Sequence, residues 1–245
     1  MQKSEEYLRH VAALLTRAAE EQLPAVEALA GRMAETLGAG RTIFLFGTGH
    51  SSLLAQELFY RAGGLVRLQP MLESALMLHE SASKSTEIER LPEYAAVLMA
   101  HYQLGAGDLL ILISNSGRNP LCVELALRAK AAGCAVVALT NRAHSLSGAS
   151  RHASGRRLLE CADLVLDNLG CPGDACIGYE NFAGRCAPTS TVVGAALLQA
   201  AVARVVELQL EAGETPEVFA SSNIDGGDAV NQTYLERYKG EIRFL

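Results

Sequence analysis

The fold of this chain is decided by residues 107–120, which read Gly-Asp-Leu-Leu-Ile-Leu-Ile-Ser-Asn-Ser-Gly-Arg-Asn-Pro. An apolar run over 109–113 stops abruptly at hydroxyl residues and a glycine. A helix-start signal follows at once, with Asn119 as the expected N-cap and Pro120 in the first turn. A buried strand, a hydroxyl loop and a helix N-terminus in this order predict a concave group of N–H and O–H donors. Such a group suits a phosphate, because the positive end of the helix dipole faces it.

A second loop of the same kind follows an earlier apolar run. Residues 41–52 read Arg-Thr-Ile-Phe-Leu-Phe-Gly-Thr-Gly-His-Ser-Ser, so a strand leads into glycines and serines and then into a helical pattern. Two strand–loop–helix units with hydroxyl-rich loops predict a site that holds two edges of one small polar ligand.

Composition limits the class of protein. The chain has 245 residues, of which 49% are hydrophobic and 20% charged, as is typical of one large globular domain. The net charge of −6 argues against nucleic acid or a membrane surface as a partner. Residues 1–7 show no secretory signal, no apolar run reaches membrane-spanning length, and the six scattered cysteines fit reduced thiols. We therefore expect a cytoplasmic protein.

Strand and helix patterns alternate along the chain, which predicts an α/β fold with a parallel sheet of five strands and helices on both faces. The whole of 1–245 is expected to form one domain, with N-terminal helices in 1–40 and a C-terminal helical tail in 213–245. Strands are expected at 42–46, 65–70, 108–113, 135–140 and 163–167. Helices are expected at 4–37 with a break at Pro24, 51–62, 72–81, 92–103, 120–132, 190–212 and 228–239, and 168–187 as a loop. Ligands of such sheets bind at the carboxyl ends of the strands, where both hydroxyl loops are expected.

Nucleotide sites do not fit these loops. The first loop has the first two glycines of a dinucleotide fingerprint but not the third, and no Gly-Lys-Ser/Thr sequence of a Walker motif occurs. The spacing of Cys171, Cys176 and Cys186 matches no paired-cysteine metal pattern. We therefore expect neither a cofactor nor a metal ion.

The two loops, Phe-Gly-Thr-Gly-His-Ser-Ser at 46–52 and Ile-Ser-Asn-Ser-Gly-Arg-Asn at 113–119, resemble those of the sugar isomerase (SIS) domain family. Pro-Thr-Ser-Thr at 188–191 resembles a third element of several members, and the resemblance spans about 25–212. Segments at 79–80, 150–155 and 225–228 resemble a subgroup of stand-alone SIS proteins related to phosphoheptose isomerase and N-acetylmuramate 6-phosphate etherase. The resemblance implies a three-layer, doubly wound SIS fold and, as is common in the family, a homodimer or higher oligomer with sites near the interface.

The resemblance also implies a sugar phosphate as ligand, held by the second loop. One residue departs from the family pattern, because Asn119 stands where a threonine is usual. The expected binding residues are Thr48, Gly49, Ser51, Ser52, Ser114, Asn115, Ser116, Gly117, Arg118, Asn119, Thr189 and Ser190.

Isomerisation or elimination on such a ligand needs a base that removes a proton next to an open-chain carbonyl. Glu80 is the first candidate, in a setting similar to that of the etherase base, and a helix-capping or solvated role is its alternative. His79 and His50 are candidates for proton transfer, because histidine titrates near neutral pH. Glu87 is the reserve base, since it follows Glu80 by about two helical turns and shares its face if the helix persists. Glu89 and its neighbours are expected to form a solvated charged patch.

The resemblance, together with these residues, implies an enzyme that acts on a sugar 6-phosphate, with an amino sugar favoured. Two reactions stay open, aldose–ketose isomerisation and elimination at C3 by a lyase or dehydratase, because one base and one enolate serve both. The alternative from another class is a non-catalytic phosphosugar sensor, which needs the phosphate loop but no base.

Overall fold

A parallel sheet forms the centre of the protein. The computed structural model describes residues 1–245. Five strands pair in the order β2-β1-β3-β4-β5, and every pair is parallel. Their bounds are β1 Ile43–Gly47, β2 Leu68–Pro70, β3 Leu109–Ile113, β4 Ala135–Thr140 and β5 Leu164–Asp167. The predicted five-stranded α/β fold is confirmed.

Both faces of this sheet are buried, which explains why its central strands β1, β3 and β4 read as apolar runs. In β1, Ile43 and Leu45 belong to one hydrophobic core, whereas Phe44 and Phe46 belong to another. Neighbouring side chains of a strand point to opposite faces, so each strand supplies both cores.

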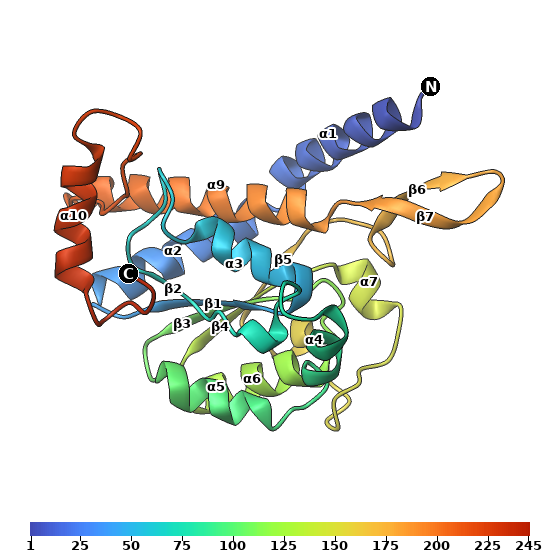
Figure 1. The fold of residues 1–245 in the computed structure, drawn as a ribbon, viewed down its shortest axis with the longest axis horizontal. Helices are drawn as coiled ribbons and strands as arrows, with labels where there is room; N and C mark the ends of the chain where they lie inside the picture. Colours follow the sequence, from blue (N-terminus) through green and yellow to red (C-terminus); the bar gives the residue numbers. More distant parts are fainter.

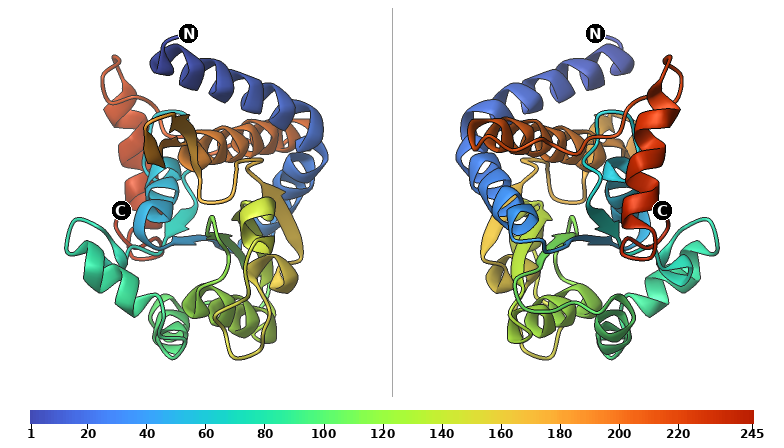
Figure 2. Two further views of the ribbon diagram at one scale, coloured as in Figure 1. Left: turned by 90° about the vertical axis from the view of Figure 1, so that its right-hand side faces the viewer. Right: turned by 90° about the vertical axis from the view of Figure 1, so that its left-hand side faces the viewer.

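Two layers of helices cover the sheet (Figures 1 and 2). The first core is closed by α1 (Lys3–Glu21), α2 (Leu23–Gly38), α3 (Ser52–Leu58) and α9 (Ser190–Glu211). The second is closed by α5 (Tyr94–Tyr102), α6 (Pro120–Ala131) and α8 (Leu158–Cys161). The predicted break at Pro24 is confirmed, because Pro24 lies in the first turn of α2. By length and composition alone α9 is apolar enough to cross a membrane, but here it supplies Leu197, Leu198 and Val205 to the first core.

The segment predicted as a loop at 168–187 contains an antiparallel hairpin, so that prediction is wrong in part. Strands β6 (Ala175–Tyr179) and β7 (Phe182–Pro188) pair with each other alone and project from the body beside α1 (Figure 1). Most side chains of this hairpin are at least partly exposed, and Phe182 is 61% exposed. A hairpin with no buried face needs no apolar alternation, and the sequence accordingly shows none.

The prediction of a helix at 72–81 is also wrong. That segment contains only the short 3₁₀ turn η2 (Ser74–Leu76), and the helix α4 (Ala82–Ile88) lies beyond it. Ser81 is the N-cap of α4, and its hydroxyl accepts a hydrogen bond from the backbone N–H of Lys84 at 3.4 Å. The capping serine therefore sets the start of this helix at a polar stretch that the apolar pattern does not mark. The remaining elements are η1 (Gly49–Ser51), α7 (Arg142–Leu146) and α10 (Gly227–Tyr238).

Candidate functional site

The second hydroxyl loop joins β3 to the N-terminus of α6, as the sequence predicts. Within it, the Ser114 hydroxyl accepts a hydrogen bond from the Gly117 backbone N–H at 3.2 Å. Gly117 has a φ of +58°, which favours glycine, and a Cβ there would lie 3.1 Å from the buried Ser145 hydroxyl. The loop is therefore tightly turned, with Ser116 half-buried at its crest.

Asn119 takes the predicted N-cap position of α6, with Pro120 in the first turn, but its side chain does not cap the helix. Asn119 Oδ1 instead accepts a hydrogen bond from Arg151 Nη1 at 2.9 Å. A charged guanidinium is a stronger donor than a helix N–H. The half-buried Arg118 is also held by this segment, because its Nε donates to the Ala149 carbonyl at 2.6 Å. Residues 149–151 therefore fasten the end of the second loop.

A chain of three amide side chains joins the carboxyl ends of β3, β4 and β5. The His144 backbone N–H donates to Asn141 Oδ1 at 2.7 Å, and Asn141 Nδ2 donates to Asn168 Oδ1 at 2.9 Å. Asn168 Nδ2 then donates to Asn115 Oδ1 at 2.8 Å. The backbone donor at one end fixes the orientation of every amide in turn. The NH2 group of Asn115 is therefore the end of the chain that remains for a ligand.

The first hydroxyl loop follows β1 and packs closely on itself. A Cβ at Gly47 would lie 2.6 Å from the Ser51 backbone, so only glycine fits at the end of this strand. The Ser52 hydroxyl donates to the Gly49 carbonyl at 2.8 Å, which gives this buried serine a local structural role.

Thr48 links the first loop to a carboxylate that the sequence placed in a solvated patch. The Thr48 hydroxyl donates to Glu89 Oε2 at 2.7 Å, and Glu89 is half-buried. The Glu89 carbonyl oxygen also accepts from the backbone N–H of Leu121 at 3.2 Å, in the first turn of α6. Glu89 thus lies between the two loops, and the expectation of a fully solvated side chain is wrong. Several charged residues follow one another here, and the sequence does not show which of these side chains faces inward.

Asp174 holds the N-terminus of α9. Its Oδ1 accepts hydrogen bonds from the backbone N–H groups of Thr189 and Ser190 at 3.1 and 3.0 Å, and its Oδ2 accepts from the Ser190 hydroxyl. The Thr189 hydroxyl is buried without a hydrogen-bond partner. No local pattern indicates a role for Asp174, because its partner helix begins sixteen residues later, beyond the hairpin.

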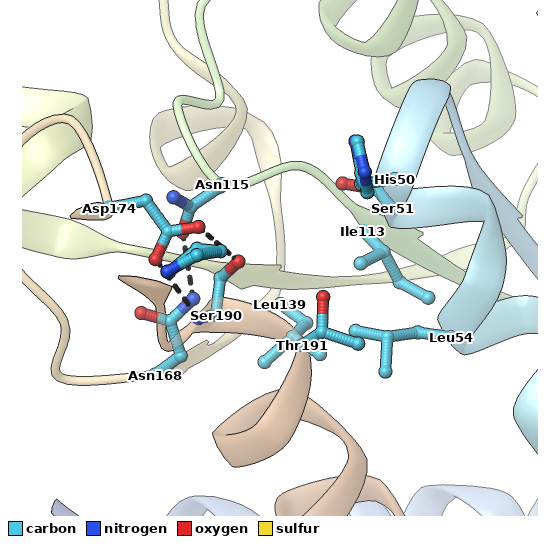
Figure 3. Close-up of a pocket in the computed structure, with 11 residues that line it drawn as sticks. His50, Ser51, Leu54, Ile113, Asn115, Leu139, Asn168, Asp174, Ser190 and Thr191 are labelled. Carbon is cyan, nitrogen blue, oxygen red and sulfur yellow. Dashed lines mark hydrogen bonds between the residues drawn. The ribbon is translucent and has the colours of Figure 1, made fainter. Parts of the chain in front are cut away.

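A polar cavity of about 210 Å³ lies between these groups (Figure 3). Of the residues expected at a site, it brings together His50, Ser51, Asn115 and Ser190, and it adds Asn168 and Asp174. Its other lining residues are Leu54, Ile113, Leu139, Pro188 and Thr191. Strand ends, both hydroxyl loops and the start of α9 therefore converge on one opening.

The candidate bases lie beside this cavity and do not line it. His79, Glu80 and Glu87 are all exposed, and Glu80 forms an ion pair with Lys84. Because α4 begins only at residue 82, Glu80 and Glu87 do not share a helix face, contrary to the expectation. The segment nevertheless adjoins the first loop, since a Cβ at Gly49 would lie 3.8 Å from the Leu78 side chain.

His144 connects the amide chain to the hairpin. Its Nδ1 accepts a hydrogen bond from the Gly173 backbone N–H at 3.1 Å. Burial lowers the pKa of His144, and the nearby Arg118 charge lowers it further. The neutral imidazole is thus the form that supports the Asp174 loop.

Comparison with known proteins gives the family. A family model for the SIS domain matches residues 6–141, more than half of the chain. The chain belongs to the SIS-domain family. It is 39% identical over 242 residues to a UPF0309 protein of Shouchella clausii, a match that covers 98% of each chain.

Solved structures of SIS-domain proteins share this fold. The phosphoheptose isomerase GmhA from Neisseria gonorrhoeae aligns with a TM-score of 0.53 at 18% identity, over 83% of this chain and 97% of that one. The Vibrio vulnificus NanR protein complexed with ManNAc-6P aligns with a TM-score of 0.54 at 19% identity, over 97% of this chain and 69% of that one.

Proposed function

We propose that this SIS-domain protein binds a sugar 6-phosphate at the carboxyl edge of its sheet. The observation that carries the proposal is the second hydroxyl loop at the N-terminus of α6, which adjoins a polar cavity bounded by the first hydroxyl loop. The phosphate is held by the hydroxyls of Ser114 and Ser116 and the backbone N–H group of Asn115, next to the positive end of α6, while the Gly117 N–H keeps the loop turned by its bond to the Ser114 hydroxyl. Arg118 and Asn119 complete this end of the site.

The sugar occupies the cavity and meets its neutral polar groups. Ser51 and Ser190 line the cavity and bind sugar hydroxyls, together with the Asn115 amide. Thr48, Gly49 and Ser52 shape the first loop around the sugar, and Thr189 precedes the first residue of α9. The solved structures of GmhA and of NanR with ManNAc-6P support a phosphosugar, because proteins of this fold bear those names.

The proposed chemistry is removal of a proton from the carbon next to the open-chain carbonyl. Glu80 is the proposed base and Glu87 the reserve, since both belong to the segment beside the first loop. His50 lines the cavity and, with His79, is the proposed proton carrier to oxygen. The enolate is then reprotonated at C1, giving an aldose–ketose isomerase, or expels a substituent from C3, giving a lyase.

A phosphosugar sensor without catalysis is the second candidate function. The observation that favours it is the exposure of Glu80 and its ion pair with Lys84, outside the lining of the cavity. A sensor needs the phosphate loop and the sugar cavity alone.

Incubation with hexose, heptose and N-acetylamino-sugar 6-phosphates in D2O tests both candidates. The enzyme incorporates deuterium at C2, and product mass separates an isomer from an eliminated product. Binding without exchange would leave only the sensor. Glu80→Gln is expected to abolish exchange and keep binding, with Glu87→Gln as the matched control, whereas Ser116→Ala weakens binding of all phosphorylated ligands. If Glu80→Gln still incorporates deuterium, the base is Glu87 or His50 and not Glu80.

We further propose a cytoplasmic homodimer with sites near its interface. Light scattering coupled to size exclusion tests the assembly: a species of one 26.0 kDa chain contradicts it.

A further inference from the structure

One carboxylate gives the cavity its electrostatic character. Asp174 is the only aspartate or glutamate among the eleven lining residues, and no lysine or arginine lies among them. The rest of the lining is neutral hydroxyl and amide groups, one exposed histidine and the apolar side chains of Leu54, Ile113, Leu139 and Pro188. The sugar cavity therefore offers no fixed positive side chain to an anionic group.

The backbone holds this carboxylate in place. Asp174 has a φ of +67°, an uncommon conformation for a residue other than glycine. It is kept there by hydrogen bonds from the Thr189 and Ser190 backbone N–H groups and from the Ser190 hydroxyl. Moving the carboxylate out of the cavity would break all three and leave the N-terminus of α9 uncapped.

Asp174 also takes the second anion-binding position near the site. The N-terminus of a long helix such as α9 attracts a negative group. Here the protein's own carboxylate already fills that position. The N-terminus of α6, with the second hydroxyl loop, therefore remains for the ligand phosphate, and the ligand has one orientation: phosphate at α6, the other end toward Asp174.

We propose that Asp174 makes the cavity select phosphosugars whose end away from the phosphate is neutral or cationic. Sugars with hydroxyl, acetamido or free amino groups at that end are accepted, because their O–H and N–H groups donate to the carboxylate. Sugars with a carboxylate or a second phosphate there are rejected by charge repulsion in a partly dehydrated site. This inference rests on the proposed phosphosugar function and deepens it.

Three ligands that differ at one position test the selection. N-acetylglucosamine 6-phosphate, N-acetylmuramate 6-phosphate and the lactyl amide of the latter are compared by calorimetric titration of the wild-type protein. The second differs from the first by a lactyl group that carries a carboxylate, and the amide keeps its bulk without its charge. We expect the carboxylate ligand to bind on the order of tenfold more weakly than the amide.

The variant Asp174→Asn then assigns the effect to this side chain. It keeps an oxygen for the α9 backbone N–H groups and removes the charge. We expect the ratio between amide and carboxylate ligands to fall to within about threefold. Glucosamine 6-phosphate, which carries an ammonium group, should lose affinity in the same variant.

The outcomes separate this inference from the proposed function. Equal binding of the amide and the carboxylate to the wild-type protein overturns the selection and leaves phosphosugar binding intact. Rejection that persists in Asp174→Asn also overturns it. If none of the four phosphosugars binds, both proposals fail together. The wild-type comparison needs no variant, so poor folding of Asp174→Asn does not remove the test.

Discussion

Replacing Asn168 by aspartate should disturb the ligand site without removing any atom from the core. Asn168 is 3% exposed, and its Nδ2 donates to Asn115 Oδ1 at 2.8 Å. In Asn168→Asp, two oxygens would face each other at this distance. The Asn115 amide is expected to turn over, so that its NH2 group donates to the new carboxylate and its carbonyl oxygen faces the ligand.

The magnitude follows from the bond that the ligand loses. The ligand loses one hydrogen bond from the Asn115 NH2 group, and an acceptor of the ligand then faces the Asn115 carbonyl oxygen. We expect this to cost about 1.5–3 kcal/mol of binding free energy. This corresponds to roughly a 10- to 150-fold loss of affinity. The protein itself should remain folded, because the new carboxylate still accepts from Asn141 Nδ2 and the Gly170 N–H, which bond Asn168 Oδ1 at 2.9 and 3.2 Å.

The assay is calorimetric titration with the phosphosugar that binds the wild-type protein, in a double-mutant cycle. Asn115→Ala removes the donor directly. If Asn168 acts through Asn115, then Asn168→Asp lowers affinity less in the Asn115→Ala background than in the wild-type protein. Wild-type affinity in Asn168→Asp, or losses that add in the double variant, would refute the reasoning.

Two further variants probe the frame of the site. Gly117→Ala should lower the free energy of unfolding by about 1–2 kcal/mol for backbone strain alone, and by more for contact with Ser145. Gly155→Ala is its control in urea unfolding, because Gly155 also has a positive φ but open space around it; equal losses would rule out the contact. For His144, whose pKa is lowered by burial, the unfolded chain takes up a proton as the pH falls below 6.5 while the folded one resists. Wild-type stability should therefore drop from pH 7.5 to 5.5 more steeply than that of His144→Gln, and equal slopes would contradict this.

The parts of the fold that the sequence predicts are those with a strong local signal. The central strands β1, β3 and β4 are recognisable because both faces are buried, so each contains an unbroken apolar run of at least four residues. The two hydroxyl loops are recognisable because glycine and hydroxyl residues interrupt those runs at the strand ends. At Ser81 the apolar pattern misleads. It indicates a helix before this residue, whereas Ser81 caps a helix that begins after it.

The parts of the site that the sequence missed depend on long-range contacts. Asn168 comes directly after β5, so the strand pattern alone places it at the edge of the sheet where ligands bind. Asp174 had no such signal, because its partners belong to a helix on the far side of the hairpin. Glu87 lies within α4 and is exposed, whereas Glu89 follows the last residue of α4 and is half-buried, and a run of charges does not reveal this difference.

The position of the hairpin has a consequence for how relatives of this protein can diverge. Asp174 precedes β6 and Ser190 follows β7, and their hydrogen bonds tie the two ends of the hairpin together at the cavity. The hairpin between Asp174 and Ser190 therefore leaves the site and returns to it, and these hydrogen bonds hold its two ends together. The tip of the hairpin, with Tyr179 and Phe182, can therefore change in length or sequence while the ligand edge keeps its shape. Relatives can thus differ in this outer surface and still share the same pocket.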